Sequence, residues 1–401
     1  PKDSYLNMKN ILSAALLSGA EAIHPGYGFL AENALFAEMV GEVGIQWIGP
    51  RPETIELMGN KANARESMRA AGVPVIPGSE GFIRDANEAK LVADRVGYPL
   101  LLKAAAGGGG KGMRFVYSED ELADKFDDAQ REAKAAFGDE HMYVEKVMEN
   151  VRHIEMQVMR DQFGHVLYFP ERNCSLQRNN QKVMEESPAL GVTPAMRENL
   201  GDIATKAVNA LQYENTGTLE FLQDHDGHFY FMEMNTRIQV EHPVTEMVTG
   251  VDLIRMQIEV AAGEPLKVSQ ADIALKGHAL EVRLNAEQPA KNFAPSAGTI
   301  DFAFLPTGGP GIRIDSAIYT GDKIQPFYDS MIGKLLVHAD NRLEAVTKMD
   351  RILDELVIQG VNTNADFQKA LLHDPTVARG MFDTRYLEKE FLPRWQASLP
   401  A

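Results

Sequence analysis

The sequence predicts a multidomain protein of α/β and α+β class, with parallel α/β structure first and antiparallel sheet later. Three observations support this fold class. The 401 residues exceed what one hydrophobic core usually organises, so several domains are expected. Short apolar runs alternate with helical patterns over the first part of the chain, which is typical of parallel α/β structure. Farther along, two apolar runs flank the turn dipeptide Asp226-Gly227, which indicates antiparallel strands.

The first part of the chain predicts parallel α/β structure followed by two helices. The expected elements in order are a strand (Ala20–Ile23), the loop HPGYGFL, a helix (Glu32–Val40), a strand (Ile45–Ile48) and helices around Glu53–Met58 and Lys61–Ala71. Before them, Ile11–Gly19 resembles the core of a signal peptide. It lacks a basic lead and a cleavage site, so we expect an amphipathic helix there.

The middle part predicts a compact α+β domain. Its expected elements are a helix (Ala86–Val96), a strand (Tyr98–Lys103), a glycine loop, a strand (Met113–Tyr117), a long helix ending near Gly138 and a strand (Met142–Val147). Ser118 and Glu121 form a Ser-x-x-Glu capping box at the start of the long helix. The rest is expected to be mostly antiparallel strands with helices between them, one running from Thr193-Pro194 to Leu211. We therefore expect domains at 1–75, 76–148 and 149–401.

The composition limits the classes of function. A formal charge of −17 argues against nucleic acid or an anionic membrane as a partner, because both attract basic surfaces. No apolar run approaches the roughly 18 residues of a membrane span. One cysteine, Cys174, excludes an internal disulfide framework and fits a cytoplasmic location.

The glycine loop Gly107–Gly112 reads GGGGKG and predicts a flap over phosphates. Adjacent glycines let successive backbone N–H groups point at one anion. The loop leads into a strand rather than a helix, so a dinucleotide fingerprint does not fit its context. Lys103 and Lys111 favour the phosphate interpretation over a flexible hairpin tip.

A hairpin predicts the metal site. The runs LEFL at 219–222 and FYFMEM at 229–234 flank Asp226-Gly227, a two-residue turn signal. Counting outward from that turn pairs Leu222 with Phe231 and Glu220 with Glu233. Facing glutamates destabilise a sheet unless a proton or cation lies between them, and Mg²⁺ or Mn²⁺ fits two carboxylates. A solvated edge strand is the alternative, but it does not explain the facing acids.

Polar side chains continue beyond this hairpin. Period-two alternation puts Asn235, Arg237, Gln239 and Glu241 on the face of Glu233 if the strand stays extended. Several isolated polar residues are by themselves compatible with surface or structural roles: Lys61, Lys146, His153, Gln177, Lys182 and Arg283.

Several segments together resemble the biotin carboxylase family of the ATP-grasp superfamily, in that family's order and over nearly the whole chain. They are HPGYGFLAEN, LLKAAAGGGGKGM, YVEKVMENVRHIEMQV, NCSLQRNNQKVMEE, GTLEFL, MEMNTRIQVEHPVTE, EVRLNAE and YDSMIGKL. The resemblance implies an ATP-grasp fold with a partial N-terminal Rossmann-like domain, a glycine-loop lid and a C-terminal antiparallel domain. It is strongest to the stand-alone subunit of bacterial acetyl-CoA carboxylase.

The resemblance also implies roles for individual residues. ATP would be bound by Lys61, Lys103, Gly109, Gly110, Glu145, Lys146, Val147, Met148, His153, Gln177, Asn180, Glu220 and Glu233. Glu220, Glu233 and Asn235 would hold Mg²⁺ or Mn²⁺. Bicarbonate would contact Lys182, Arg237, Gln239, Val240 and Glu241, with Glu241 as general base, and biotin would contact Arg283 and Tyr27. The catalytic set is then Arg237, Glu241, Lys182 and Arg283.

The implied reaction is carboxylation of biotin on a biotin carboxyl carrier protein, with ATP and bicarbonate as substrates and carboxyltransferase subunits as further partners. The implied pathway is malonyl-CoA synthesis in fatty acid biosynthesis. A carboxylase domain of a pyruvate or propionyl-CoA carboxylase and an inactive nucleotide-binding fragment are the alternatives. The sequence departs from the family at Asn180, where histidine is usual, and at Ala106, where glycine is usual. The family's first strand–turn–helix unit is expected before Pro1, and with it a homodimer.

Overall fold

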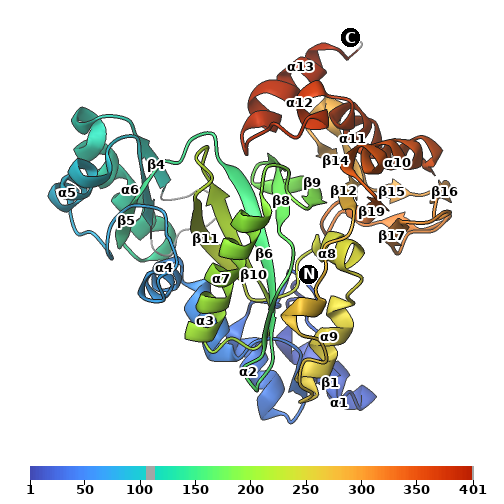
Figure 1. Cartoon of the computed structure of the whole chain (residues 1–401), viewed down its shortest axis with the longest axis horizontal. Coiled ribbons are helices and arrows are strands. Elements are labelled where there is room, and N and C mark those ends of the chain that lie inside the picture. Colours follow the sequence, from blue (N-terminus) through green and yellow to red (C-terminus); the bar gives the residue numbers. More distant parts are fainter. Residues whose placement is uncertain (105–112, 400–401) are drawn as a thin grey trace.

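The structure is a computed structural model that describes residues 1–104 and 113–399 (Figure 1). The predicted phosphate flap, with Ala106, Gly109, Gly110 and Lys111, lies outside the described residues.

The N-terminal part has alternating helices and short strands, as predicted. Its elements are α1 (Met8–Ser18), β1 (Ala22–Ile23), α2 (Ala34–Glu42), β2 (Gln46–Trp47), α3 (Pro52–Gly59) and α4 (Lys61–Ala70). The strands pair in parallel, with Ala22 opposite Gln46. Asparagine side chains cap α1 and α2, because each accepts a bond from a backbone N–H that has no partner within the helix. The amphipathic helix expected in place of a signal peptide is confirmed as α1, which buries Leu12 and Ala15.

The next part is a small lid with a hydrophobic core of its own. It contains α5 (Ala86–Val96), β3 (Leu100–Ala104), β4 (Met113–Val116), η1 (Glu119–Glu121), α6 (Leu122–Phe137) and β5 (Met142–Lys146). The antiparallel sheet has the order β4-β3-β5, and Leu100 and Leu102 of β3 share a fully buried core with Phe126 of α6. The capping box of Ser118 and Glu121 is confirmed, although it begins a 3₁₀ turn that leads into α6.

A nine-stranded antiparallel sheet dominates the remainder. Its strands are β6 (Arg152–Arg160), β7 (Val166–Tyr168), β8 (Arg172–Arg178), β9 (Gln181–Ser187), β10 (Asn215–Gln223), β11 (Phe229–Asn235), β12 (His278–Asn285), β17 (Ile312–Ser316) and β19 (Met331–Ala339). Their order is β11-β10-β6-β8-β9-β12-β19-β17, with β7 paired to β6. The sheet therefore runs from the middle of the molecule into the C-terminal part (Figure 1).

Helices cover this sheet and complete the C-terminal part. They are α7 (Pro194–Ala210), α8 (His242–Thr249), α9 (Leu253–Ala261), η2 (Gln270–Asp272), η3 (Pro289–Lys291), α10 (Arg342–Glu355), α11 (Ala365–Leu372), α12 (Pro375–Ala378), η4 (Leu387–Phe391) and α13 (Leu392–Ala397). Short strands lie between them: β13 (Glu287–Gln288), β14 (Ala294–Pro295), β15 (Gly298–Thr299), β16 (Phe302–Phe304), β18 (Lys323–Ile324) and β20 (Val357–Gln359).

The packing of α7 decides which face of the sheet is free for chemistry. Leu200 and Ala204 of α7 share a core with Leu219 and Phe221 of β10. Because side chains alternate along a strand, Glu220 projects from the opposite face. The functional side chains therefore lie on the side of the sheet away from α7.

The hairpin β10–β11 corrects part of the sequence prediction. Glu220 does pair with Glu233, but Leu222 pairs with Tyr230 rather than with Phe231. The turn is one residue longer than predicted, because the N–H of Asp224 bonds to the carbonyl of His228. A bulge at Met232 then restores the predicted register at the glutamates. The longer turn and the bulge each shift the register by one residue, and the two shifts offset each other.

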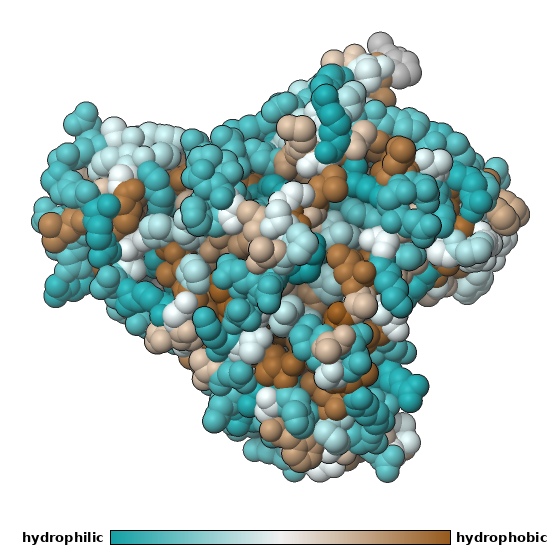
Figure 2. All heavy atoms as spheres, viewed as in Figure 1, coloured by the Kyte–Doolittle hydropathy of each residue, from teal (hydrophilic) through white to brown (hydrophobic). Residues whose placement is uncertain are grey.

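The surface agrees with the composition. The face in Figure 2 is largely hydrophilic, with hydrophobic side chains in scattered patches. Among the described residues, no helix combines the length and hydropathy that crossing a bilayer requires.

Candidate active site

The site is centred on the ammonium group of Lys182, which lies among three buried carboxylates. Lys182 Nζ is 2.5 Å from Glu241 Oε1 and 3.1 Å from Glu220 Oε1, and it also bonds Glu155 Oε1. Burial opposes the charge of Lys182, but these three acids hold its pKa well above the ordinary value. Lys182 is therefore a fixed cation at neutral pH.

Three glutamates form a row across neighbouring strands. Glu220 on β10 lies opposite Glu155 on β6 and opposite Glu233 on β11. The sequence analysis predicted the second pair and missed the first. Like charges at facing positions destabilise a sheet, so this row requires cations close to it.

Glu220, at the centre of the row, is surrounded by positively charged groups and hydrogen-bond donors. His153 Nε2 lies 3.0 Å from its Oε2, while Asn235 Nδ2 at 2.6 Å and Gln239 Nε2 at 2.7 Å donate to its Oε1. Burial works against the carboxylate, yet Lys182 and His153 lower the pKa of Glu220 to about 2. The side chain remains an anion across the physiological range.

The charge on His153 follows from the same acids. Burial opposes the imidazolium, but Glu220 and Glu155 outweigh it and raise the pKa of His153 to about 9. The amide group of Gln177 lies beside the other ring nitrogen, 2.7 Å from Nδ1. His153 and Gln177, both predicted near the nucleotide, are thus in contact.

The carboxylate of Glu155 is held in place by a fully buried arginine, Arg172. Arg172 lies 3.0 Å from Glu155 Oε2 and also donates to Gln239 Oε1. Burial disfavours the Glu155 anion, but Lys182 and Arg172 keep its pKa well below the usual range. Arg172 therefore fixes two sides of the cluster at once.

The predicted polar stripe of 235–241 converges on the site by a different path. β11 ends at Asn235, so the chain does not stay extended as expected, and Glu241 instead precedes the first residue of α8. Arg237 bonds Asn235 Oδ1 at 2.9 Å and Glu32 Oε2 at 2.8 Å. The carbonyl of Val240 accepts from Lys334 Nζ at 2.7 Å.

Arg283 and Tyr27 approach the cluster from other parts of the chain. Arg283 Nη2 lies 3.1 Å from Glu241 Oε2, which connects β12 to the base candidate. Tyr27 belongs to the loop HPGYGFL, and Lys334 Nζ lies 5.6 Å from the centre of its ring. Lys334 was not predicted.

The remaining residues predicted to bind the nucleotide lie where the lid joins the rest of the molecule. Lys103 pairs with Glu145 across β3 and β5, and Lys61 Nζ lies 3.0 Å from Glu233 Oε2. Lys146 donates to the carbonyl of Tyr98, and Val147 to that of Pro99. The two backbone bonds hold the chain that continues to Met148. Asn180 occupies a left-handed position in the β8–β9 turn, with φ of 60°.

The oxygen donors around Glu220 fit a hard divalent cation. Glu220 and Glu233 face each other and provide carboxylate oxygens of the kind that Mg²⁺ prefers. Asn235 lies beside them, with its Nδ2 donating to Glu220 and its Oδ1 accepting from Arg237. Lys61 contacts Glu233 and Lys182 contacts Glu220, so each of the two glutamates has a positive charge beside it.

Sequence reasoning missed Glu155, Arg172, Glu32 and Lys334. One signal for Glu155 was available, because His153, Glu155 and Gln157 alternate in the strand RHIEMQV. Its pairing with Glu220 spans more than sixty residues, which a hairpin count cannot reach.

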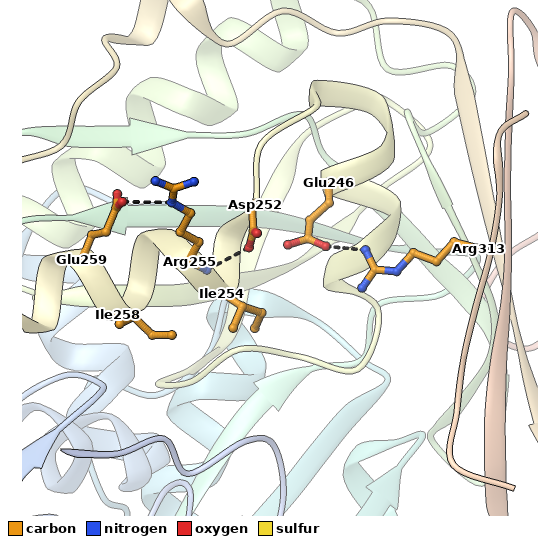
Figure 3. Close-up of a pocket in the computed structure, with 7 residues that line it drawn as sticks. All are labelled: Glu246, Asp252, Ile254, Arg255, Ile258, Glu259 and Arg313. Carbon is orange, nitrogen blue, oxygen red and sulfur yellow. Dashed lines mark hydrogen bonds and ion pairs between the residues drawn. The ribbon is translucent and has the colours of Figure 1, made fainter. Parts of the chain in front are cut away.

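A surface pocket elsewhere in the molecule is lined by none of the predicted site residues. It lies over α9 and β17 and is lined by Glu246, Asp252, Ile254, Arg255, Ile258, Glu259 and Arg313 (Figure 3). Arg313 turns toward Glu246, and Arg255 toward Glu259, so these four charges are paired.

Comparison with known proteins identifies the fold and the family. Residues 60–269 match the family described as carbamoyl-phosphate synthase L chain, ATP binding domain. Residues 1–55 and 281–389 match the N-terminal and C-terminal domains of biotin carboxylase.

Similar proteins cover the whole chain. Biotin carboxylase 1 of Bacillus subtilis is 51% identical over 96% of this chain and 86% of its own length. The small subunit of 2-oxoglutarate carboxylase from Hydrogenobacter thermophilus is 50% identical over 97% of this chain and 82% of its own length. A crystal structure of the biotin carboxylase domain dimer of that carboxylase, with MgADP, ADP and bicarbonate, has a TM-score of 0.91 at 49% identity, covering 100% of this chain and 88% of that one.

The fold is that of the ATP-grasp enzymes, and the buried acids and cations equip it for ATP-dependent ligase chemistry. Within this class, the chain belongs to the biotin carboxylase family.

Proposed function

We propose that this protein carboxylates the biotin of a biotin carboxyl carrier protein, using ATP and bicarbonate. The observation that supports this most directly is the contact of Lys182 with both Glu220 and Glu241. It joins a metal-binding candidate to a base candidate through one fixed cation. Similar enzymes whose structures contain bicarbonate and MgADP agree with this substrate set.

The proposed chemistry begins with the proton of bicarbonate. Glu241 accepts this proton, and a bicarbonate oxygen attacks the γ-phosphorus of ATP, so that ADP leaves and carboxyphosphate forms. Lys182, Arg237, Gln239 and the backbone at Val240 would hold the bicarbonate. Lys61, Lys103 and His153 would offset the charge on the transferring phosphoryl group. Mg²⁺ or Mn²⁺ bound by Glu220, Glu233 and Asn235 would neutralise phosphate oxygens.

Carboxyphosphate then decomposes to CO₂ and phosphate in the closed site. The phosphate takes the ureido proton of biotin, and the resulting enolate attacks CO₂ to give carboxybiotin. Arg283 would stabilise the enolate, and Tyr27 would lie beside the bicyclic ring. The adenine would contact the backbone between Glu145 and Met148, with Gln177 and Asn180 near the sugar. Gly109 and Gly110 would cover the phosphates.

The test is ATP hydrolysis that requires bicarbonate and is stimulated by free biotin. Glu233→Gln should abolish Mg²⁺-dependent turnover and leave the circular dichroism spectrum unchanged. Glu264→Gln, in an exposed loop, is the matched control and should retain activity. Wild-type protein without bicarbonate-dependent hydrolysis would refute the proposed function, and normal hydrolysis by Glu233→Gln would refute the metal site.

The proposed setting is the acetyl-CoA carboxylase of fatty acid synthesis, in the cytoplasm, with carboxyltransferase subunits and as a homodimer. The domain division at 75 and 148 remains part of this proposal. Identities of 51% to a biotin carboxylase and 50% to components of a pyruvate carboxylase and of a 2-oxoglutarate carboxylase do not favour one acceptor. Transfer of labelled carboxylate to acetyl-CoA rather than to pyruvate or 2-oxoglutarate, with each purified carboxyltransferase, discriminates among them.

A further inference from the structure

Arg283 connects two buried acids, Glu185 on β9 and Glu241 before α8. Its Nε is 2.7 Å from Glu185 Oε1 and its Nη2 is 2.6 Å from the same oxygen, while Nη2 also reaches Glu241 Oε2 at 3.1 Å. The Arg283 side chain remains 18% exposed, so part of the guanidinium faces the site. Two of the three contacts are with Glu185 and are the shorter ones, so Glu185 holds Arg283 more strongly than Glu241 does.

Among the described residues, Glu185 forms no ion pair other than the one with Arg283. It lies on β9 with no exposure, and its Oε2 has no hydrogen-bond partner among the described residues. A buried carboxylate is costly unless it is paired, and its one pairing here is with Arg283.

A second buried acid sits directly opposite. Glu281 on β12 is the cross-strand partner of Glu185, also without exposure, and within the described chain neither of its oxygens has a partner. Two facing buried carboxyls cannot both ionise at low cost, so the proton belongs on Glu281, which lacks a cation in contact. Burial and Glu185 accordingly hold the pKa of Glu281 well above its usual value, against Lys334.

The two acids that hold Arg283 change differently during the proposed reaction. Glu241 becomes neutral when it accepts the proton of bicarbonate, and its attraction for Arg283 then weakens. Glu185 has no part in this proton transfer and keeps its bond. We propose that Glu185 is a positioning residue that keeps the guanidinium of Arg283 in place for biotin after Glu241 has been protonated. This inference rests on the proposed function.

The groups around Glu185 make its ion pair with Arg283 dependent on pH. The titratable groups that face it are Arg283 and Glu281 from β12, Glu241 before α8, Cys174 from β8 and Lys182 on its own strand. Burial raises the pKa of Glu185 to about 7, although Arg283 opposes the shift. Ionisation above this pH strengthens the pair, so the hold on Arg283 should improve between about pH 6 and pH 8.

The test measures coupling, defined as carboxybiotin formed from labelled bicarbonate per ADP released. Glu185→Gln keeps the size of the side chain and removes its charge, so coupling should fall about tenfold, the effect of losing one charged hydrogen bond. Glu185→Asp should fall less, because the charge remains. The wild-type rise in coupling from pH 6 to pH 8 should be absent in Glu185→Gln.

Glu281→Gln is the matched control, since it is the same substitution at the facing buried position. It resembles the protonated acid and should keep coupling within about twofold of the wild type. A merely structural role for Glu185 would lower ADP release and carboxybiotin together and leave their ratio unchanged, which would overturn the proposal. Equal loss in Glu281→Gln would overturn it as well. Absence of bicarbonate-dependent hydrolysis in the wild type would instead refute the proposed function.

Discussion

The ammonium nitrogen of Lys182 lies 2.5 Å from Oε1 of Glu241, the residue that precedes α8. The same nitrogen bonds Glu155 and Glu220, so one cation serves three acids from three different elements. The charges of Lys182 and these three glutamates are therefore coupled, and substituting one of them should affect the other three.

Lys182→Met should destabilise the protein strongly. Removing the cation leaves buried carboxylates uncompensated, which typically costs about 3–5 kcal/mol. The free energy of unfolding in urea, followed by circular dichroism, measures this loss. Lys267→Met removes a lysine that pairs with Glu259 and Glu264 at the surface and should change the midpoint little. Equal midpoints for the two variants would contradict the central role of Lys182.

Glu32→Gln should weaken bicarbonate binding. Glu32 accepts from Arg237 Nε at 2.8 Å and from the N–H of Thr236 at 3.1 Å, so it aims Arg237 into the site. Loss of its charge should raise the KM for bicarbonate by about three- to tenfold. The KM for ATP should stay the same, and a parallel rise in both constants would argue for general damage instead. Glu38→Gln, on the exposed face of α2, is the control.

Stability in acid should depend on Glu186. Its carboxylate accepts from Arg342 Nε at 2.6 Å and lies 3.0 Å from His278 Nε2. Burial opposes the anion, but His278 and Arg342 lower the pKa of Glu186 to about 2. Because the folded-state pKa is depressed, the contribution is complete above about pH 4.5 and disappears as the pH falls toward 2. It amounts to about 3 kcal/mol.

Trp395 reports this loss, since it packs against Phe367 in the C-terminal core, whereas Trp47 lies in the N-terminal core. In a Trp47→Phe background, the urea midpoint from Trp395 fluorescence should fall between pH 5 and pH 2. Glu186→Gln should start from a lower midpoint and show a smaller fall. An unchanged slope in that variant would assign the acid sensitivity to other groups.

Glu281→Gln should stabilise the protein at alkaline pH. The folded-state pKa of Glu281 is raised, first by burial, so its contribution becomes unfavourable as the pH rises above about 4.5. Glutamine removes this penalty, and the gain in the Trp395 midpoint should be larger at pH 8 than at pH 5. Glu355→Gln, at an exposed position of α10, should show no such pH dependence.

The sequence allowed the pairing of Glu220 with Glu233 to be predicted, because both lie in one local hairpin. The prediction reached the right register although the turn was wrong, since the bulge at Met232 cancelled the longer turn. Glu155 could not be found in this way, because its position depends on the pairing of β6 with β10.

Glu241 shows a second limit of local patterns. Period-two counting placed it on the face of Glu233, and it does reach the site, but through the loop after β11 and the start of α8. Which strands become neighbours and where a chain turns are tertiary properties, and these decided the rest of the site.

The bridges at the base of the lid define where it can pivot. Val75 pairs with Phe231 of the body, whereas Gly78 pairs with Glu145 of the lid, so the free link on this side is Ile76-Pro77. The apolar core of the lid is made of residues between Ile83 and Val144 and stays closed around itself whatever the lid's orientation. A swing about Ile76-Pro77 would expose little apolar surface. It would disturb the bonds from Arg65 to the carbonyls of Ile76 and Ser79 and the ion pair of Arg69 with Glu80. Opening would thus be limited by hydrogen bonds at one joint rather than by the hydrophobic effect.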